Sequence, residues 1–153
     1  KSNNVKALRA FPEKHNYLLN GITFGSLFEV MIEKNIPLLL KYDWELITDL
    51  LSDFPELTII VMDHGRWGRD RYFRPLVEKY DNIYLDISAY ELDGGIEDFC
   101  GKYGPGPLLF GTGIPQTPGG GALLHLTNAQ ISIEEKEKIA SENLENILQG
   151  VKL

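Results

Sequence analysis

Charged side chains and one histidine stand at the ends of short apolar runs in this sequence. Lys41 closes one run, His64 follows a second after one intervening residue, and Asp86 lies near the end of a third. An imidazole and a carboxylate can exchange protons with a small molecule, and a fixed ammonium can bind a carboxylate or polarise a carbonyl. Where parallel strands end, their side chains share one edge of the sheet, which is where α/β proteins bind ligands. We therefore take His64, Lys41 and Asp86 as candidate catalytic residues.

Three further residues are candidates for binding a substrate. Arg9 lies in the first apolar run, and Arg66 and Trp67 follow His64. A guanidinium can hold a carboxylate through two parallel hydrogen bonds, and a tryptophan in a loop can line a pocket. Two structural interpretations stay open beside these: Lys41 can pair with an acid at a strand end, and His64 can hydrogen-bond neighbouring backbone.

The elements that must position these residues are short strands and amphipathic helices. Nearly continuous apolar runs are typical of strands that are buried on both faces. The predicted strands are Val5–Phe11, Ile36–Lys41, Leu57–Met62, Ile83–Ile87 and Leu108–Phe110. The intervening segments carry apolar stripes at helical spacing. The predicted helices are Ser26–Asn35, Trp44–Leu51, Arg71–Tyr80, Ile96–Tyr103 and a short one over Ala122–Leu126.

Strands and helices alternate at the length of a βαβ unit, which predicts an α/β fold with a parallel sheet. The chain then ends in a further helix. Ser132 and Glu135 have the spacing of a capping box at its start, and Gly150 is a plausible stop. Two architectures fit this pattern: an open doubly wound sheet of five strands, or the rear part of a (β/α)8 barrel. Periodicity does not choose between them.

Composition narrows the classes of function. The chain has 153 residues, which suits one domain, and a net charge of -7, which removes the main attraction for nucleic acids. The apolar runs are too short to span a bilayer, so we expect no membrane partner. The one cysteine and the lack of a visible signal peptide predict a cytoplasmic protein.

A set of longer motifs resembles the amidohydrolase superfamily, and more narrowly its amidohydrolase-2 branch of hydrolases and related decarboxylases. The motifs are VKALRAFP, IPLLLKY, DFPELTIIVMDHGRWG, YDNIYLDIS, LLFGTGIPQTPGG and ISIEEKEKIASENLENIL. The resemblance implies a TIM (β/α)8 barrel of which this chain is the C-terminal part, about strands four to eight. Residues 1–153 would then form a single amidohydrolase-like domain that lacks the N-terminal strands of a full barrel.

The resemblance also implies a divalent metal such as zinc, held by histidines after several strands and an aspartate after the last. In this sequence the position of the fifth-strand histidine falls on Lys41, and that of the final aspartate falls on Gly113. His64 matches the sixth-strand histidine and is the candidate metal ligand. The metal site is therefore expected to be degenerate, and the alternative is that no cofactor binds.

Together these features predict a hydrolase of the amidohydrolase superfamily that acts on a small carboxylated or lactone-like substrate. The alternative is a non-catalytic binding protein with the same fold. An incomplete barrel exposes strand edges with unpaired backbone groups. We therefore expect either a homo-oligomer or an N-terminal segment that precedes this chain.

Overall fold

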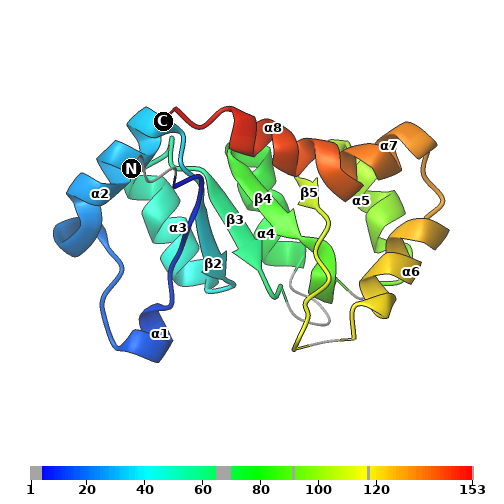
Figure 1. The fold of residues 1–153 in the computed structure, drawn as a ribbon, viewed down its shortest axis with the longest axis horizontal. Coiled ribbons are helices and arrows are strands. Elements are labelled where there is room, and N and C mark those ends of the chain that lie inside the picture. The colour runs from blue at the N-terminus through cyan, green and yellow to red at the C-terminus, as the bar shows by residue number, and fades with distance from the viewer. Residues whose placement is uncertain (1–4, 65–69, 91, 117, 153) are drawn as a thin grey trace.

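The computed structural model describes residues 5–64, 70–90, 92–116 and 118–152. Five parallel strands form its one sheet, and they stand side by side in the order in which they occur in the chain (Figure 1). The strands are β1 (Leu8–Arg9), β2 (Leu38–Lys41), β3 (Ile59–Met62), β4 (Ile83–Asp86) and β5 (Leu108–Leu109). A doubly wound sheet reverses its strand order part-way. The sequential order therefore excludes that alternative and confirms the arrangement of a partial TIM barrel.

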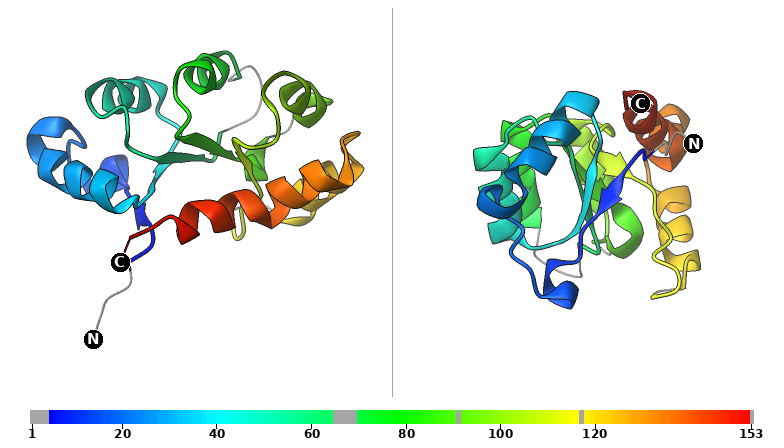
Figure 2. Two further views of the ribbon diagram at one scale, coloured as in Figure 1. Left: turned by 90° about the horizontal axis from the view of Figure 1, so that it is seen from above. Right: turned by 60° about the vertical axis from the view of Figure 1, so that its left-hand side comes forward.

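Helices connect the strands and lie in an arc along one side of the sheet, which we call the helix face (Figure 2). The helices of this arc are α2 (Gly21–Lys34), α3 (Trp44–Asp53), α4 (Asp70–Lys79) and α5 (Gly95–Tyr103). Two short elements, α1 (Pro12–His15) and the 3-10 turn η1 (Ile87–Ala89), follow the ends of β1 and β4. All connections run in the same sense, as in a barrel.

Side chains alternate between the two faces along each strand, as the pleat requires. In β2, Leu38 and Leu40 join the hydrophobic core against the helices, while Lys41 is exposed. In β3, Ile59 and Val61 point to the same core. Lys41 therefore lies on the opposite side of the sheet, which we call the open face.

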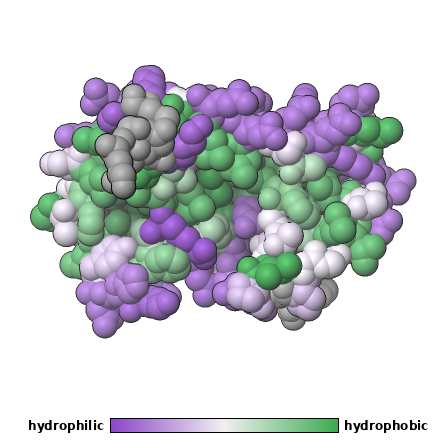
Figure 3. All heavy atoms as spheres, viewed as in Figure 1, coloured by the Kyte–Doolittle hydropathy of each residue, from purple (hydrophilic) through white to green (hydrophobic). Residues whose placement is uncertain are grey.

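The C-terminal segment leaves the arc at the end of β5, and its last part crosses the open face at the end where the strands begin (Figures 1 and 2). It consists of α6 (Gly120–Asn128), α7 (Ile133–Glu137), the π-turn η2 (Lys138–Glu142) and α8 (Asn143–Gln149). Its far end reaches α2, where the backbone N–H of Lys152 donates to the carbonyl of Lys34 at 2.8 Å. Figure 3 shows hydrophobic residues gathered over the middle of this face and hydrophilic residues along the margin that α7 and α8 occupy.

Most elements begin and end within two residues of the predicted positions, helix α1 was not predicted, and three elements differ more. The helix predicted from Ser26 begins at Gly21, because the Asn20 side chain accepts a hydrogen bond from Thr23 N and caps an earlier start. The first strand is limited to Leu8–Arg9. The terminal helix has the predicted Ser132 capping box but is interrupted by the π-turn. Within the described residues, no helix is long and apolar enough to cross a membrane.

Candidate functional site

Four charged residues meet on the open face where β1 to β4 end, and we call them the strand-end cluster. They are Arg9, Lys41, Asp63 and Asp86. Lys41 Nζ lies 3.5 Å from Asp63 Oδ2, and both side chains are more than half exposed. The charges of Asp63 and Arg9 both act on Asp86, in opposite directions. The sheet therefore brings together two cations and two carboxylates from four neighbouring strands.

Asp86 is the least exposed member of this cluster. Its carboxylate packs against Gly111, where a Cβ would lie 2.2 Å from Asp86 Oδ1, so residue 111 must be glycine. Asp86 Oδ1 accepts a hydrogen bond from Ser88 N at 2.7 Å. Burial raises the pKa of Asp86, and the negative charge of Asp63 adds to the rise, while Ser88 and Arg9 oppose it. A carboxyl with a raised pKa is suited to hold or accept a proton.

Backbone conformation at Asp63 decides where His64 lies. Regular alternation after Met62 would send Asp63 toward the helices and His64 to the open face. Asp63 instead has a φ of 55°, in the left-handed region that aspartate tolerates better than most residues. The chain turns there, so that Asp63 reaches Lys41 and His64 enters the helix layer. The side chain of His64 is only 2 % exposed and contacts the rings of Trp44 and Phe73.

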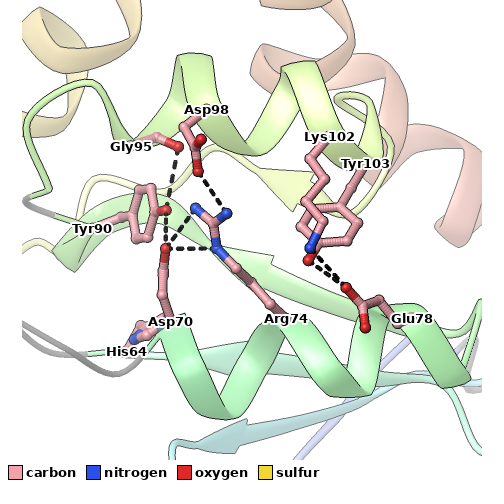
Figure 4. A network of polar contacts seen from close by, with 9 residues as sticks. All are labelled: His64, Asp70, Arg74, Glu78, Tyr90, Gly95, Asp98, Lys102 and Tyr103. Carbon is pink, nitrogen blue, oxygen red and sulfur yellow. Dashed lines mark hydrogen bonds and ion pairs between the residues drawn. The ribbon is translucent and has the colours of Figure 1, made fainter.

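His64 belongs to a second polar group, which we call the Asp70 network (Figure 4). Asp70 begins α4, and its Oδ2 accepts hydrogen bonds from Tyr90 Oη at 2.8 Å and Arg74 Nε at 3.0 Å. Arg74 also forms a 2.5 Å ion pair with Asp98 of α5. His64 Nε2 lies 3.5 Å from Asp70 Oδ1. The network joins α4, α5 and the segment after β4, and the buried imidazole lies at its edge beside Asp70.

Protonation in this network follows from its contacts. Burial opposes the ionisation of Asp70, but the nearby His64 and the hydrogen bonds from Tyr90 and Arg74 outweigh it and lower the pKa of Asp70. Burial and the neighbouring Asp70 both raise the pKa of Tyr90. Asp70 is therefore a carboxylate that receives protons in hydrogen bonds, and Tyr90 is a neutral donor to it.

The residues that the structure describes do not fit the metal that the resemblance implies. Among them, no group of three or more His, Cys, Asp or Glu side chains is placed to hold an ion. Lys41 offers an ammonium where a ligand is expected, and Gly113 has no side chain that could bind a metal. His64, the candidate ligand, packs among aromatic rings in the helix layer.

The predicted site residues thus fall into two groups. Lys41, Asp86 and Arg9 are brought together on the open face. His64 lies apart from them in the helix layer. Arg66 and Trp67 lie outside the described residues. A cavity of about 290 Å³ lies beside Lys41, between the end of β2 and helix α1.

Sequence reasoning missed Asp70, Arg74 and Tyr90. One signal was present: Asp70 and Arg74 are four residues apart, the spacing at which an acid and a base pair on a helix. The partners from other elements carried no such signal, because contacts between α4, η1 and α5 depend on tertiary structure.

Several solved structures are similar to this one. An uncharacterised TIM-barrel protein from Bordetella bronchiseptica aligns with a TM-score of 0.67 and 26% identity, over 83% of this chain and 50% of its own. 4-Oxalomesaconate hydratase from Rhodopseudomonas palustris aligns with a TM-score of 0.62 and 20% identity, over 94% of this chain and 55% of its own. 5-Carboxyvanillate decarboxylase from Sphingomonas paucimobilis aligns with a TM-score of 0.63 and 16% identity, over 84% of this chain and 53% of its own.

The chain has part of a TIM-barrel fold. It spans about half the length of each of these proteins, which agrees with five strands of an eight-stranded barrel. These similarities show the fold, and that fold agrees with the barrel that the sequence motifs imply. Neither a protein-family model nor a curated protein matches the chain.

Proposed function

We propose that this chain carries part of the active site of an amidohydrolase-like hydrolase that acts on a small carboxylated or lactone-like molecule. One observation carries the proposal: two cations and a carboxyl with a raised pKa meet where parallel strands end on the open face. This is the edge at which barrels and other parallel α/β folds bind ligands. The neighbouring hydratase and decarboxylase are named for 4-oxalomesaconate and 5-carboxyvanillate, which both carry carboxylates.

In this proposal each residue of the strand-end cluster has a role. Lys41 and Arg9 bind a carboxylate or polarise a carbonyl of the substrate. Asp86 donates or accepts a proton at Oδ2, because its Oδ1 is held by Ser88. Asp63 holds the ammonium of Lys41 in place. No step is assigned to a metal, because the described residues do not fit one.

A second candidate function is binding without catalysis. The burial of His64 and the position of Gly113 favour it, since both are sites at which the resemblance places groups of the metal centre. In this alternative, Lys41 and Arg9 hold a carboxylate and no bond is broken. We also propose a homo-oligomer or a preceding N-terminal segment. Either would supply further side chains at the ends of the strands.

Calorimetric titration with a panel of small aliphatic and aromatic carboxylates tests the site. We expect at least one panel member to bind, and Lys41→Ala and Arg9→Ala each to weaken it about tenfold, the cost of losing a hydrogen bond to a charged group. Lys34→Ala is the matched control, because it removes a cation at the end of α2, near the start of β2. Equal affinity in all four proteins would refute the role of the strand-end cluster.

Asp86→Asn separates the two candidate functions. The amide keeps the shape and can still accept from Ser88 N, but it neither holds nor releases the proton. For a hydrolase we expect the variant to bind a panel carboxylate as well as the native protein while hydrolysis of its ester or lactone falls at least a hundredfold. Unchanged hydrolysis would exclude Asp86 as the proton donor or acceptor. If the native protein binds the ligand without hydrolysing it, the binding function is favoured.

A further inference from the structure

The outer edge of β5 is the place where a barrel would continue with another strand. In the parallel pair of β4 and β5, Leu85 is level with Leu108, and Leu85 N donates to Pro107 O at 2.8 Å. The backbone groups of residues 107 and 109 therefore face β4, and those of residues 108 and 110 face away from it. Leu108 O and Phe110 N are thus the groups that a following strand would bind.

Both groups already have partners, and both partners come from the C-terminal segment. The side-chain Nδ2 of Asn143 donates to Leu108 O at 2.9 Å and to Pro105 O at 2.9 Å. Phe110 N donates to the carbonyl of Ile139 at 2.9 Å. A helix thus supplies one donor and one acceptor in the positions where a strand would supply them.

The π-turn η2 explains how a helix can offer a backbone acceptor. In a regular α-helix the carbonyl of Ile139 would accept from Asn143 N, four residues on. In η2 the N–H of Asn143 donates to Lys138 O, five residues back, so the carbonyl of Ile139 is available to Phe110. The side chain of Ile139 is 1% exposed and fixes this turn in the core.

The other end of the segment is tied to the opposite side of the sheet. Asn35 Nδ2 donates to Gly150 O at 3.0 Å, and Lys6 Nζ, just before β1, donates to Leu148 O at 3.3 Å. The segment therefore runs from the outer edge of β5 across to the region where β1 and β2 begin, as Figures 1 and 2 show.

We propose that residues 138–152 are an edge cap, which ends the sheet at β5 by occupying the hydrogen-bonding positions of the next strand. Strand edges left open pair readily with other chains. The cap keeps β5 from pairing with the edge strand of a second copy, and a strand can join β5 only after Asn143 and Ile139 have been displaced. This inference does not depend on the chemistry of the strand-end cluster, although Phe110 directly precedes Gly111, against which Asp86 packs.

Asn143→Leu tests the cap, because it removes the donor to Leu108 O and keeps a side chain of similar size. Asn146→Leu is the matched control: it adds the same apolar side chain to an exposed position of α8, one turn away. Amide hydrogen exchange at Phe110 is the first measurement. We expect it to become about tenfold faster in Asn143→Leu than in Asn146→Leu, since the edge hydrogen bonds weaken together. Sedimentation is the second, and we expect only Asn143→Leu to form a larger assembly than the native protein does.

Deletion of Ser141 provides an independent test of the π-turn. It places Lys138 and Asn143 four residues apart, so the helix can close in regular bonds that withdraw the carbonyl of Ile139 from Phe110. We expect the same faster exchange at Phe110, with helical content by circular dichroism preserved. Protection of Phe110 and a molecular mass that both stay unchanged in Asn143→Leu and in the deletion would overturn the proposal.

Discussion

At the residue scale, environment rather than residue type distinguishes the carboxylates at the ends of the strands. Asp86 is partly buried against Gly111 and has a raised pKa, while Asp70 receives hydrogen bonds from a tyrosine and an arginine and has a lowered one. The sequence indicated that polar groups follow the strands. It did not indicate which of them would be buried, because burial depends on loops that pack from elsewhere in the chain.

The raised pKa of Asp86 predicts how its stability contribution changes with pH. The folded protein holds this proton more tightly than the unfolded chain, so stability falls as pH rises from the unfolded value through the folded pKa. Asp86→Asn removes this dependence and keeps the acceptor for Ser88 N. In urea denaturation, we expect the variant to have a larger free energy of unfolding than the native protein at pH 7.5. This difference should narrow toward pH 4. The exposed Asp93→Asn serves as the control, and an equal gain there would contradict the assignment.

Tyr90 is predicted to stabilise the fold through its hydroxyl. It donates to Asp70 Oδ2 at 2.8 Å, so Tyr90→Phe removes a hydrogen bond to a partly buried carboxylate. We expect the free energy of unfolding to fall by about 1.5–3 kcal/mol at pH 7, measured in urea. Tyr72→Phe is the comparison, because the ring of Tyr72 stacks on Trp44 and its side chain is largely exposed. A loss of the same size at Tyr72 would show that the effect at Tyr90 is not specific to Asp70.

At the scale of elements, local signals predicted the helices and strands better than their junctions. The Ser132 capping box and the buried strands around Leu40 and Val61 follow from residue type and spacing. The π-turn and the left-handed Asp63 do not, because each is held by contacts with a distant strand or helix. These two junctions decide where His64 lies and how β5 ends. Because the turn at Asp63 could not be foreseen, the sequence predicted that His64 would lie with the other strand-end residues.

Ser132 should stabilise α7 by the two reciprocal hydrogen bonds of its capping box. Ser132→Ala removes the acceptor for Glu135 N, and we expect a loss of about 1 kcal/mol in the free energy of unfolding. Exchange of the Glu135 amide reports the same loss locally. Ser141→Ala provides the contrast, since this exposed serine lies within η2 rather than at a cap. Native-like exchange at Glu135 in Ser132→Ala would mean that the capping box contributes nothing.

At the scale of the whole molecule, the order of the strands and the path of the tail define a sheet with one capped edge. The spacing of the strands predicted a parallel sheet, and the motifs chose the barrel over the doubly wound alternative, which the strand order confirms. The path of the tail was not predictable, because its amphipathic pattern indicates that it packs on a core without indicating which part. The partners of Asn143 and Asn35 show that it joins both sides of the sheet.

This path makes the end of the described chain unusually important for stability. Residues near a chain end commonly fray and tolerate substitution, yet Val151 is only 8% exposed and packs into the core next to the Lys152–Lys34 hydrogen bond. We expect Val151→Ala to lower the free energy of unfolding by about 1–2 kcal/mol through lost burial. Lys152→Ala keeps the backbone bond and should cost less than about 0.5 kcal/mol. Urea denaturation of both variants decides the matter, and equal, negligible losses would mean that the tail is not docked across the sheet in solution.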